Sequence, residues 1–257
     1  MPHFVGMIPG FLRKALRERP AAEDPPHVDL DHAGRPIRVA LRRVTQARRF
    51  TLRVSATTGE VVLTLPRRAS LTEALRFADR QSGWIAARLE AVPQTIALEP
   101  GAIVPVRDVP HRIVHRPAVR ITTIENHDGE YQLVIGGAAS HVGRRVTDFL
   151  KREARRDIEA AVTKYAASLS VRPASITLKD TKSRWGSCAA SRRLAFSWRL
   201  VFAPSFVLDY LAAHEVTHLR EMNHSACFWR LLNGVCADTD RAEHWLKMNG
   251  AKLHRYR

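Results

Sequence analysis

The sequence predicts an α+β fold, with a β-rich N-terminal lobe that carries one helix and a helical C-terminal core that contains short strands. Two observations lead to this class. Up to about residue 140, β-branched residues alternate or cluster in short runs, which is typical of strands. From residue 141 onward, apolar residues recur at helical spacing. We therefore expect a tail at residues 1–34, the lobe at 35–140 and the core at 141–257.

The lobe is expected to hold seven strands and one helix. The first three strands form a predicted antiparallel meander, because Thr57-Thr58-Gly59 supplies a turn between the second and the third. Ser70 and Glu73 have capping-box spacing and begin a helix that runs to Val92, with a break or kink expected at Gly83. A turn at residues 126–129 joins the last two strands. The strands are expected at residues 37–44, 49–55, 60–65, 103–106, 112–116, 119–123 and 131–135.

The core is expected to begin with a long amphipathic helix at residues 141–168, whose apolar positions form one stripe. Strands at 176–180 and 194–200 follow. A further helix begins at Pro204-Ser205 and is strongly apolar along its length, as expected of a helix buried in a core. Two shorter helices complete the chain, at residues 226–236 and 239–249.

Cysteine content and hydropathy favour a cytoplasmic protein. The chain has three cysteines and no Cys-x-x-Cys pair, which argues for a reducing compartment and against a zinc site built from cysteines. The apolar start, residues 1–12, precedes its positive charges, which is the reverse of the order in a secretory signal. No run of about 18 apolar residues occurs, so we expect no membrane partner.

The net charge is strongly positive, +16 from 41 Lys and Arg against 25 Asp and Glu. Such a balance favours contact with polyanions, including nucleic acids. The alternative is that the charge is spread over all faces and serves solubility, because no arginine run is long enough to form a nucleic-acid arm by itself.

The stretch His214-Glu215-Val216-Thr217-His218 lies on the apolar helix. Histidines four residues apart share one helix face, where their nitrogens can occupy adjacent corners of a tetrahedral zinc. Glu215 then stands beside the open corner, where it can act as general base on a zinc-activated water. The alternative is a buried helix with two hydrogen-bonded core histidines.

A third ligand is expected at His224, six residues after His218. This spacing equals that of HExxHxxGxxH zinc sites, in which a glycine lets the chain turn back to the metal. Glu221 stands at the glycine position here, so we expect Asn223 to make the turn in the left-handed region. A downstream carboxylate, Glu243, is the alternative third ligand.

Several further blocks accompany this motif, and together they are more specific than the motif alone. The chain resembles the YgjP-like (SprT-like, WLM-type) zinc metallopeptidases from about residue 140 to 250. The resemblance implies that His214, His218 and His224 bind one zinc ion, that Glu215 is the catalytic glutamate, and that the core is zincin-like. Only Thr217 departs from the pattern at the metal, where a small apolar residue is more usual. The blocks are Ser183-Arg184-Trp185-Gly186-Ser187-Cys188, Phe196-Ser197-Trp198-Arg199-Leu200, the motif with Leu219, Glu221-Met222-Asn223-His224-Ser225 and Phe228-Trp229.

Three other residues are candidates for binding the substrate or the oxyanion. Arg184 lies on an expected turn beside the motif helix and can hold a carboxylate, a phosphate or an oxyanion. Arg199 and its neighbour Trp198 lie on an expected strand that would pair with an extended peptide. Tyr210 precedes His214 by one turn and can donate a hydrogen bond, although a packed aromatic is the alternative.

The leading hypothesis is therefore a zinc-dependent metallohydrolase that cleaves peptide bonds of a peptide or protein substrate. A second hypothesis keeps the metal and replaces the substrate with a phosphoanhydride, as in a nucleotide pyrophosphatase, with Arg184 and Arg199 on the phosphates. A third is a basic, nucleic-acid-associated binding protein, against which the intact Glu215 argues.

Overall fold

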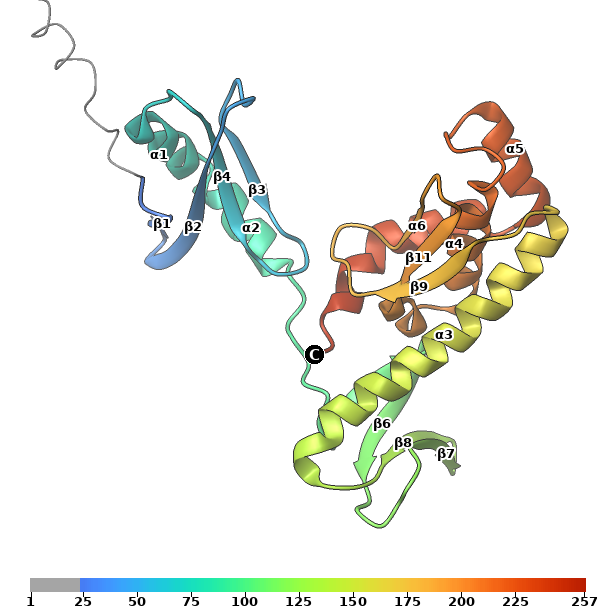
Figure 1. Cartoon of the computed structure of the whole chain (residues 1–257). Coiled ribbons are helices and arrows are strands. Elements are labelled where there is room, and N and C mark those ends of the chain that lie inside the picture. Colours follow the sequence, from blue (N-terminus) through green and yellow to red (C-terminus); the bar gives the residue numbers. More distant parts are fainter. Residues whose placement is uncertain (1–23) are drawn as a thin grey trace, which may run out of the picture. The chain divides into compact units, whose positions relative to one another are not determined.

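The computed structural model describes residues 24–257, and these divide after Ala91 into two compact units (Figure 1). Of the predicted tail, residues 1–23 lie outside the described residues. The tail does not extend to residue 34, because His27–His32 already form a strand. Among residues 24–257, no helix combines the length and apolar character needed to cross a membrane.

The first unit is a four-stranded sheet with two helices. Its order is β1-β2-β4-β3, and β2 runs parallel to β4, so the predicted meander is wrong. In this order β4 lies inside the sheet, and every second residue of it is buried. The short, half-exposed β3 lies at the edge. The strands are β1 (His27–His32), β2 (Arg35–Val44), β3 (Thr51–Val54) and β4 (Val61–Pro66).

Two helices, α1 (Leu71–Arg80) and α2 (Ser82–Glu90), replace the single helix that was expected. The predicted cap is confirmed, since the Ser70 hydroxyl accepts a hydrogen bond from the backbone N–H of Glu73 at 3.4 Å. The break falls at Gln81, which leaves the helical region, rather than at Gly83. Both helices pack on the sheet, and together they form a hydrophobic core that is separate from the core of the second unit.

The second unit begins with a four-stranded sheet of order β5-β6-β8-β7. The expected strand at 119–123 is wrong, because that segment is a loop and pairing starts only at Thr123. The hairpin turn is confirmed at Asp128 and Gly129, both with positive φ. The strands are β5 (Ile103–Val106), β6 (Val109–His115), β7 (Thr123–His127) and β8 (Glu130–Ile135).

The long helix α3 (Val142–Ser168) follows η1 (Ala139–His141) and matches its prediction closely. Figure 1 shows it running from the β6/β8 sheet to β9 (Ser175–Lys179) and β11 (Arg193–Ser197). Its stripe shares one core with Val104, Ile113 and Leu133. The division into compact units falls at 91/92, whereas a boundary was expected at 140/141, and β5–β8 are packed against the helix that follows them.

The third sheet has the order β10-β11-β9 and so leaves β10 (Gly186–Cys188) at an edge. No strand was expected there, since three small residues carry no apolar alternation. The expected strand at 194–200 ends at Ser197, whose hydroxyl caps a 3-10 helix, η2 (Trp198–Phe202), by accepting from the Arg199 N–H.

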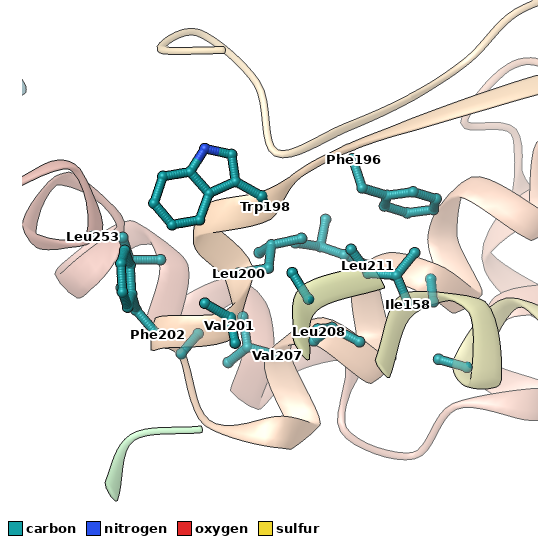
Figure 2. Close-up of a cluster of buried hydrophobic side chains, with 14 of the residues drawn as sticks. Ile158, Phe196, Trp198, Leu200, Val201, Phe202, Val207, Leu208, Leu211 and Leu253 are labelled. Carbon is teal, nitrogen blue, oxygen red and sulfur yellow. The ribbon is translucent and has the colours of Figure 1, made fainter. Parts of the chain in front are cut away.

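Helix α4 (Ser205–Thr217) carries the motif and is buried on almost all sides. Figure 2 shows its Leu208 and Leu211 packed beside Leu200 of η2 and Ile158 of α3. This packing fixes the helix from several directions. The chain continues through α5 (Ala226–Val235), α6 (Thr239–Asn249) and η3 (Gly250–His254).

Candidate active site

Three histidines meet where α4 ends. His214 lies in the last turn, His218 directly follows the helix, and His224 lies in the loop before α5. Their candidate ligand nitrogens all lie within 4.8 Å of one another. The Nε2 atoms of His214 and His224 are 3.1 Å apart. In a tetrahedral zinc site with Zn–N bonds of about 2.0–2.1 Å, neighbouring nitrogens are about 3.3 Å apart, so the spacing of this pair fits.

The turn that returns His224 differs from the one expected. Asn223 does not have a positive φ; its side-chain oxygen accepts a hydrogen bond from the Ser225 N–H at 3.0 Å, as in an Asx turn. The Ser225 hydroxyl then caps α5 by accepting from the Phe228 N–H at 3.3 Å. The Phe228 ring is fully buried, with its centroid 4.6–5.0 Å from all three imidazoles. No contact with the histidines was predicted for Phe228, which had been singled out only as part of the Phe228-Trp229 block.

Hydrogen bonds at Nδ1 leave the Nε2 atoms of two histidines free to bind a metal. The His218 Nδ1–H donates to the Glu221 carbonyl at 3.0 Å. Tyr210 donates its hydroxyl proton to Glu243 at 2.7 Å and lies 3.3 Å from the His214 Nδ1, from which it can accept. Such outer partners fix the tautomer and the ring orientation of metal-binding histidines.

Two of the imidazoles, those of His214 and His218, are held in the neutral form that metal binding requires. Burial lowers the pKa of His214 to about 4, and the charges of His218 and His224 act in the same direction. Burial also lowers the pKa of His218, although the hydrogen bond to Glu221 opposes this. Three imidazoles form a donor set suited to zinc and similar divalent metals.

Glu215 is only 5% exposed and lies beside β10. Burial raises the pKa of its carboxyl group to about 7, and the positive charge of Arg184 acts in the opposite direction. A Cβ atom at Gly186 would lie 2.4 Å from the Glu215 Oε1. The backbone of β10 therefore approaches the carboxylate as closely as a residue without a side chain allows.

The alternative third ligand, Glu243, lies outside the cluster found among the described residues. It reaches the site indirectly, through the Tyr210 hydroxyl. Tyr210 is itself buried. Its burial is the main cause that raises the pKa of its hydroxyl, and the hydrogen bond to Glu243 acts in the same direction. Tyr210 thus contacts a histidine of the site. Because it is buried, it does not present an open face to a substrate.

The substrate role expected of Arg199 is corrected. Its guanidinium is buried, pairs with Asp180 through bonds of 2.6 and 3.1 Å and donates to the Tyr256 carbonyl at 2.8 Å. These contacts tie η2 to the C-terminal segment and leave the guanidinium no access to a ligand. Trp198 is likewise buried, because the chain leaves the sheet at Ser197. Arg184 remains exposed on the turn before β10.

Three imidazoles that meet at the end of α4, with a buried glutamate directly after the first of them in sequence, define a site of the type that metal-dependent hydrolases use. A family model described as YgjP-like, metallopeptidase domain, matches residues 48–249. The chain belongs to this family. Searches of curated proteins and of solved structures give no match. Membership implies a hydrolase that uses a divalent metal and acts on peptides or proteins.

Proposed function

We propose that the protein is a zinc metallopeptidase with one zinc ion held by His214, His218 and His224. The observation that carries this proposal is the meeting of three imidazoles at the end of α4, the helix that carries the buried Glu215. Family membership supports the peptide as substrate class. Zinc in this position supplies Lewis-acid chemistry, since it polarises a carbonyl and lowers the pKa of water.

Glu215 is the general base of the proposed reaction. Its carboxylate takes a proton from the attacking water as the carbon–oxygen bond forms, and gives that proton to the amine nitrogen as the carbon–nitrogen bond breaks. A pKa near 7 suits both transfers at neutral pH, because a group can then accept and release a proton with little cost. Burial, the main cause of this pKa, also keeps bulk water away from the carboxylate.

The edge strand β10 gives the substrate a backbone to pair with. Only one side of β10 is occupied, by β11, and an extended peptide can add to the other side as a further strand. Because Gly186 lies against Glu215, pairing there would bring a peptide carbonyl close to the general base. This strand takes the role that the sequence assigned to residues 194–200.

The two other hypotheses have less support. A phosphoanhydride substrate was expected to need both Arg184 and Arg199, and Arg199 is fully engaged inside the protein. The nucleic-acid hypothesis rests on the net charge of +16 alone.

A turnover assay with the full-length chain tests the proposal. The zinc-loaded protein, the chelator-treated protein and a Glu215→Gln variant are incubated with a mixture of unstructured peptides and, separately, with nucleoside triphosphates. We expect cleaved peptides from the zinc-loaded wild type alone, identified by mass spectrometry. Hydrolysis of nucleotides without peptide cleavage would replace this proposal with the phosphoanhydride hypothesis.

A further inference from the structure

A cavity of about 330 Å³ lies on the third sheet, next to the candidate active site. Lys179 at the end of β9 and Arg184 on the turn before β10 line it together with the hydroxyl groups of Thr181, Ser183 and Ser187. Among residues 24–257, no acidic side chain lines it. The cavity therefore presents two positive charges and several hydrogen-bond donors, which is the donor set of an anion site.

Neither charge belongs to an ion pair among the described residues, although the Arg184 charge also acts on the nearby Glu215 carboxylate. Among the described residues, the Lys179 ammonium and the Arg184 guanidinium have no carboxylate partner, whereas the nearby Arg199 is paired with Asp180. The turn that carries Arg184 is anchored. The Arg184 carbonyl accepts a hydrogen bond from the Thr181 hydroxyl at 2.7 Å, and the adjacent Trp185 packs on His254 with ring centroids 4.9 Å apart. A guanidinium on an anchored turn loses little backbone freedom when it binds an anion.

Strand register places part of the cavity lining on the face of β10 opposite to the one from which a Cβ at Gly186 would point toward Glu215, although Gly186 and its partner Phe196 also line the cavity. Ser187 pairs with Ala195, and both line the cavity, as does Lys179. Gly186, one position before Ser187, points toward Glu215. Successive side chains of a strand alternate between faces. A peptide paired with the free edge of β10 would therefore direct alternate side chains toward Glu215 and toward the cavity.

We propose that this cavity is a specificity subsite that binds the carboxylate of an Asp or Glu side chain close to the scissile bond. The proposal rests on the peptidase function proposed above and adds the substrate class. Lys179 and Arg184 determine the preference by pairing with the substrate carboxylate, and the hydroxyl groups of Ser183 and Ser187 complete its hydrogen bonds. Because both cations are exposed, the preference decreases as ionic strength rises.

Peptide affinity tests the subsite independently of turnover. The full-length Glu215→Gln variant, loaded with zinc, is titrated with labelled ten-residue peptides that carry Glu or Gln at one position, which is moved along the peptide. We expect one position at which Glu binds about tenfold more tightly than Gln, as charge-assisted hydrogen bonds provide. The added double change Lys179→Gln and Arg184→Gln should remove this difference, so that the Glu and Gln peptides bind equally.

Lys182→Gln is the matched control, because Lys182 lies on the same turn, is exposed and does not line the cavity. It should retain the full difference between Glu and Gln peptides. Equal affinities at every position, no binding of either peptide, or the same loss in the Lys182 variant would overturn the subsite. Peptide cleavage by the wild type without any preference for Glu would overturn the subsite and leave the proposed function intact. If no peptide is cleaved but the Glu peptide still binds more tightly than the Gln peptide, the proposed function is overturned and the subsite is retained.

Discussion

The close approach of β10 to Glu215 makes Gly186→Ala an informative perturbation. The added Cβ would lie 2.4 Å from the Glu215 Oε1, 2.7 Å from its Cγ and 2.8 Å from its Cδ, where ordinary contacts begin at 3.4 Å. Gly186 has no positive φ, so the alanine backbone itself is unstrained. The carboxylate must therefore move by about 1 Å, a displacement that can reduce a catalytic rate by about 100-fold.

We expect Gly186→Ala to lower kcat on a cleaved peptide by about 100-fold while zinc content stays at the wild-type level. Metal binding should persist because the contacts of the added atom are with Glu215 and not with the histidines. The atoms it meets belong to the end of a side chain, so thermal stability should fall only modestly. The measurements are kcat, zinc per chain by elemental analysis and the unfolding midpoint.

Gly234→Ala is the control, since a Cβ there meets no atom within 4 Å. This helical glycine should tolerate alanine with unchanged kcat and a gain in stability of about 0.5–1 kcal/mol. Unchanged kcat in Gly186→Ala would refute the argument that β10 positions Glu215. Loss of zinc in Gly186→Ala would refute the argument that the general base can be displaced without disturbing the metal site.

Three further predictions concern residues around the site. Glu243→Gln and Tyr210→Phe should each weaken zinc affinity by about 10-fold or more in a competition titration with a chelator, because each breaks the chain of contacts that orients His214; unchanged affinity in both would mean that the chain is incidental. Phe228→Ala should lower the free energy of unfolding, measured by urea denaturation, by about 3–5 kcal/mol, since it empties the space beneath three imidazoles. A loss below about 1 kcal/mol would contradict this packing. Arg199→Gln should destabilise the fold by about 1.5–3 kcal/mol through the lost bonds to Asp180 and the Tyr256 carbonyl and leave KM for peptides unchanged; a raised KM without destabilisation would restore the substrate role.

Local patterns predicted the helices well because a helix depends on neighbours in sequence. The apolar stripe of α3 and the capping serine of α1 each involve residues within a few turns, and both were confirmed. The spacing of His214, His218 and His224 likewise placed the three histidines together, since two share a helix face and the third follows a short loop.

Strand partners and burial were harder to predict because they depend on contacts across the chain. The parallel pairing of β2 with β4 cannot be inferred from the turn that joins β3 to β4. Gly186 gave no strand signal, yet its pairing with Phe196 forms the edge beside Glu215. Arg199 resembled a substrate ligand in sequence, because nothing local reveals that Asp180 and Tyr256 occupy its guanidinium.

Metal content per chain tests the central claim most directly, measured by elemental analysis on the wild type, His224→Ala and Glu215→Gln purified in parallel. The account predicts one zinc ion in the wild type and in Glu215→Gln, and much less in His224→Ala. One zinc ion in all three proteins would contradict the three-histidine site and return Glu243 to consideration as a ligand. No metal in any of them, even after zinc is supplied, would contradict the proposed function itself.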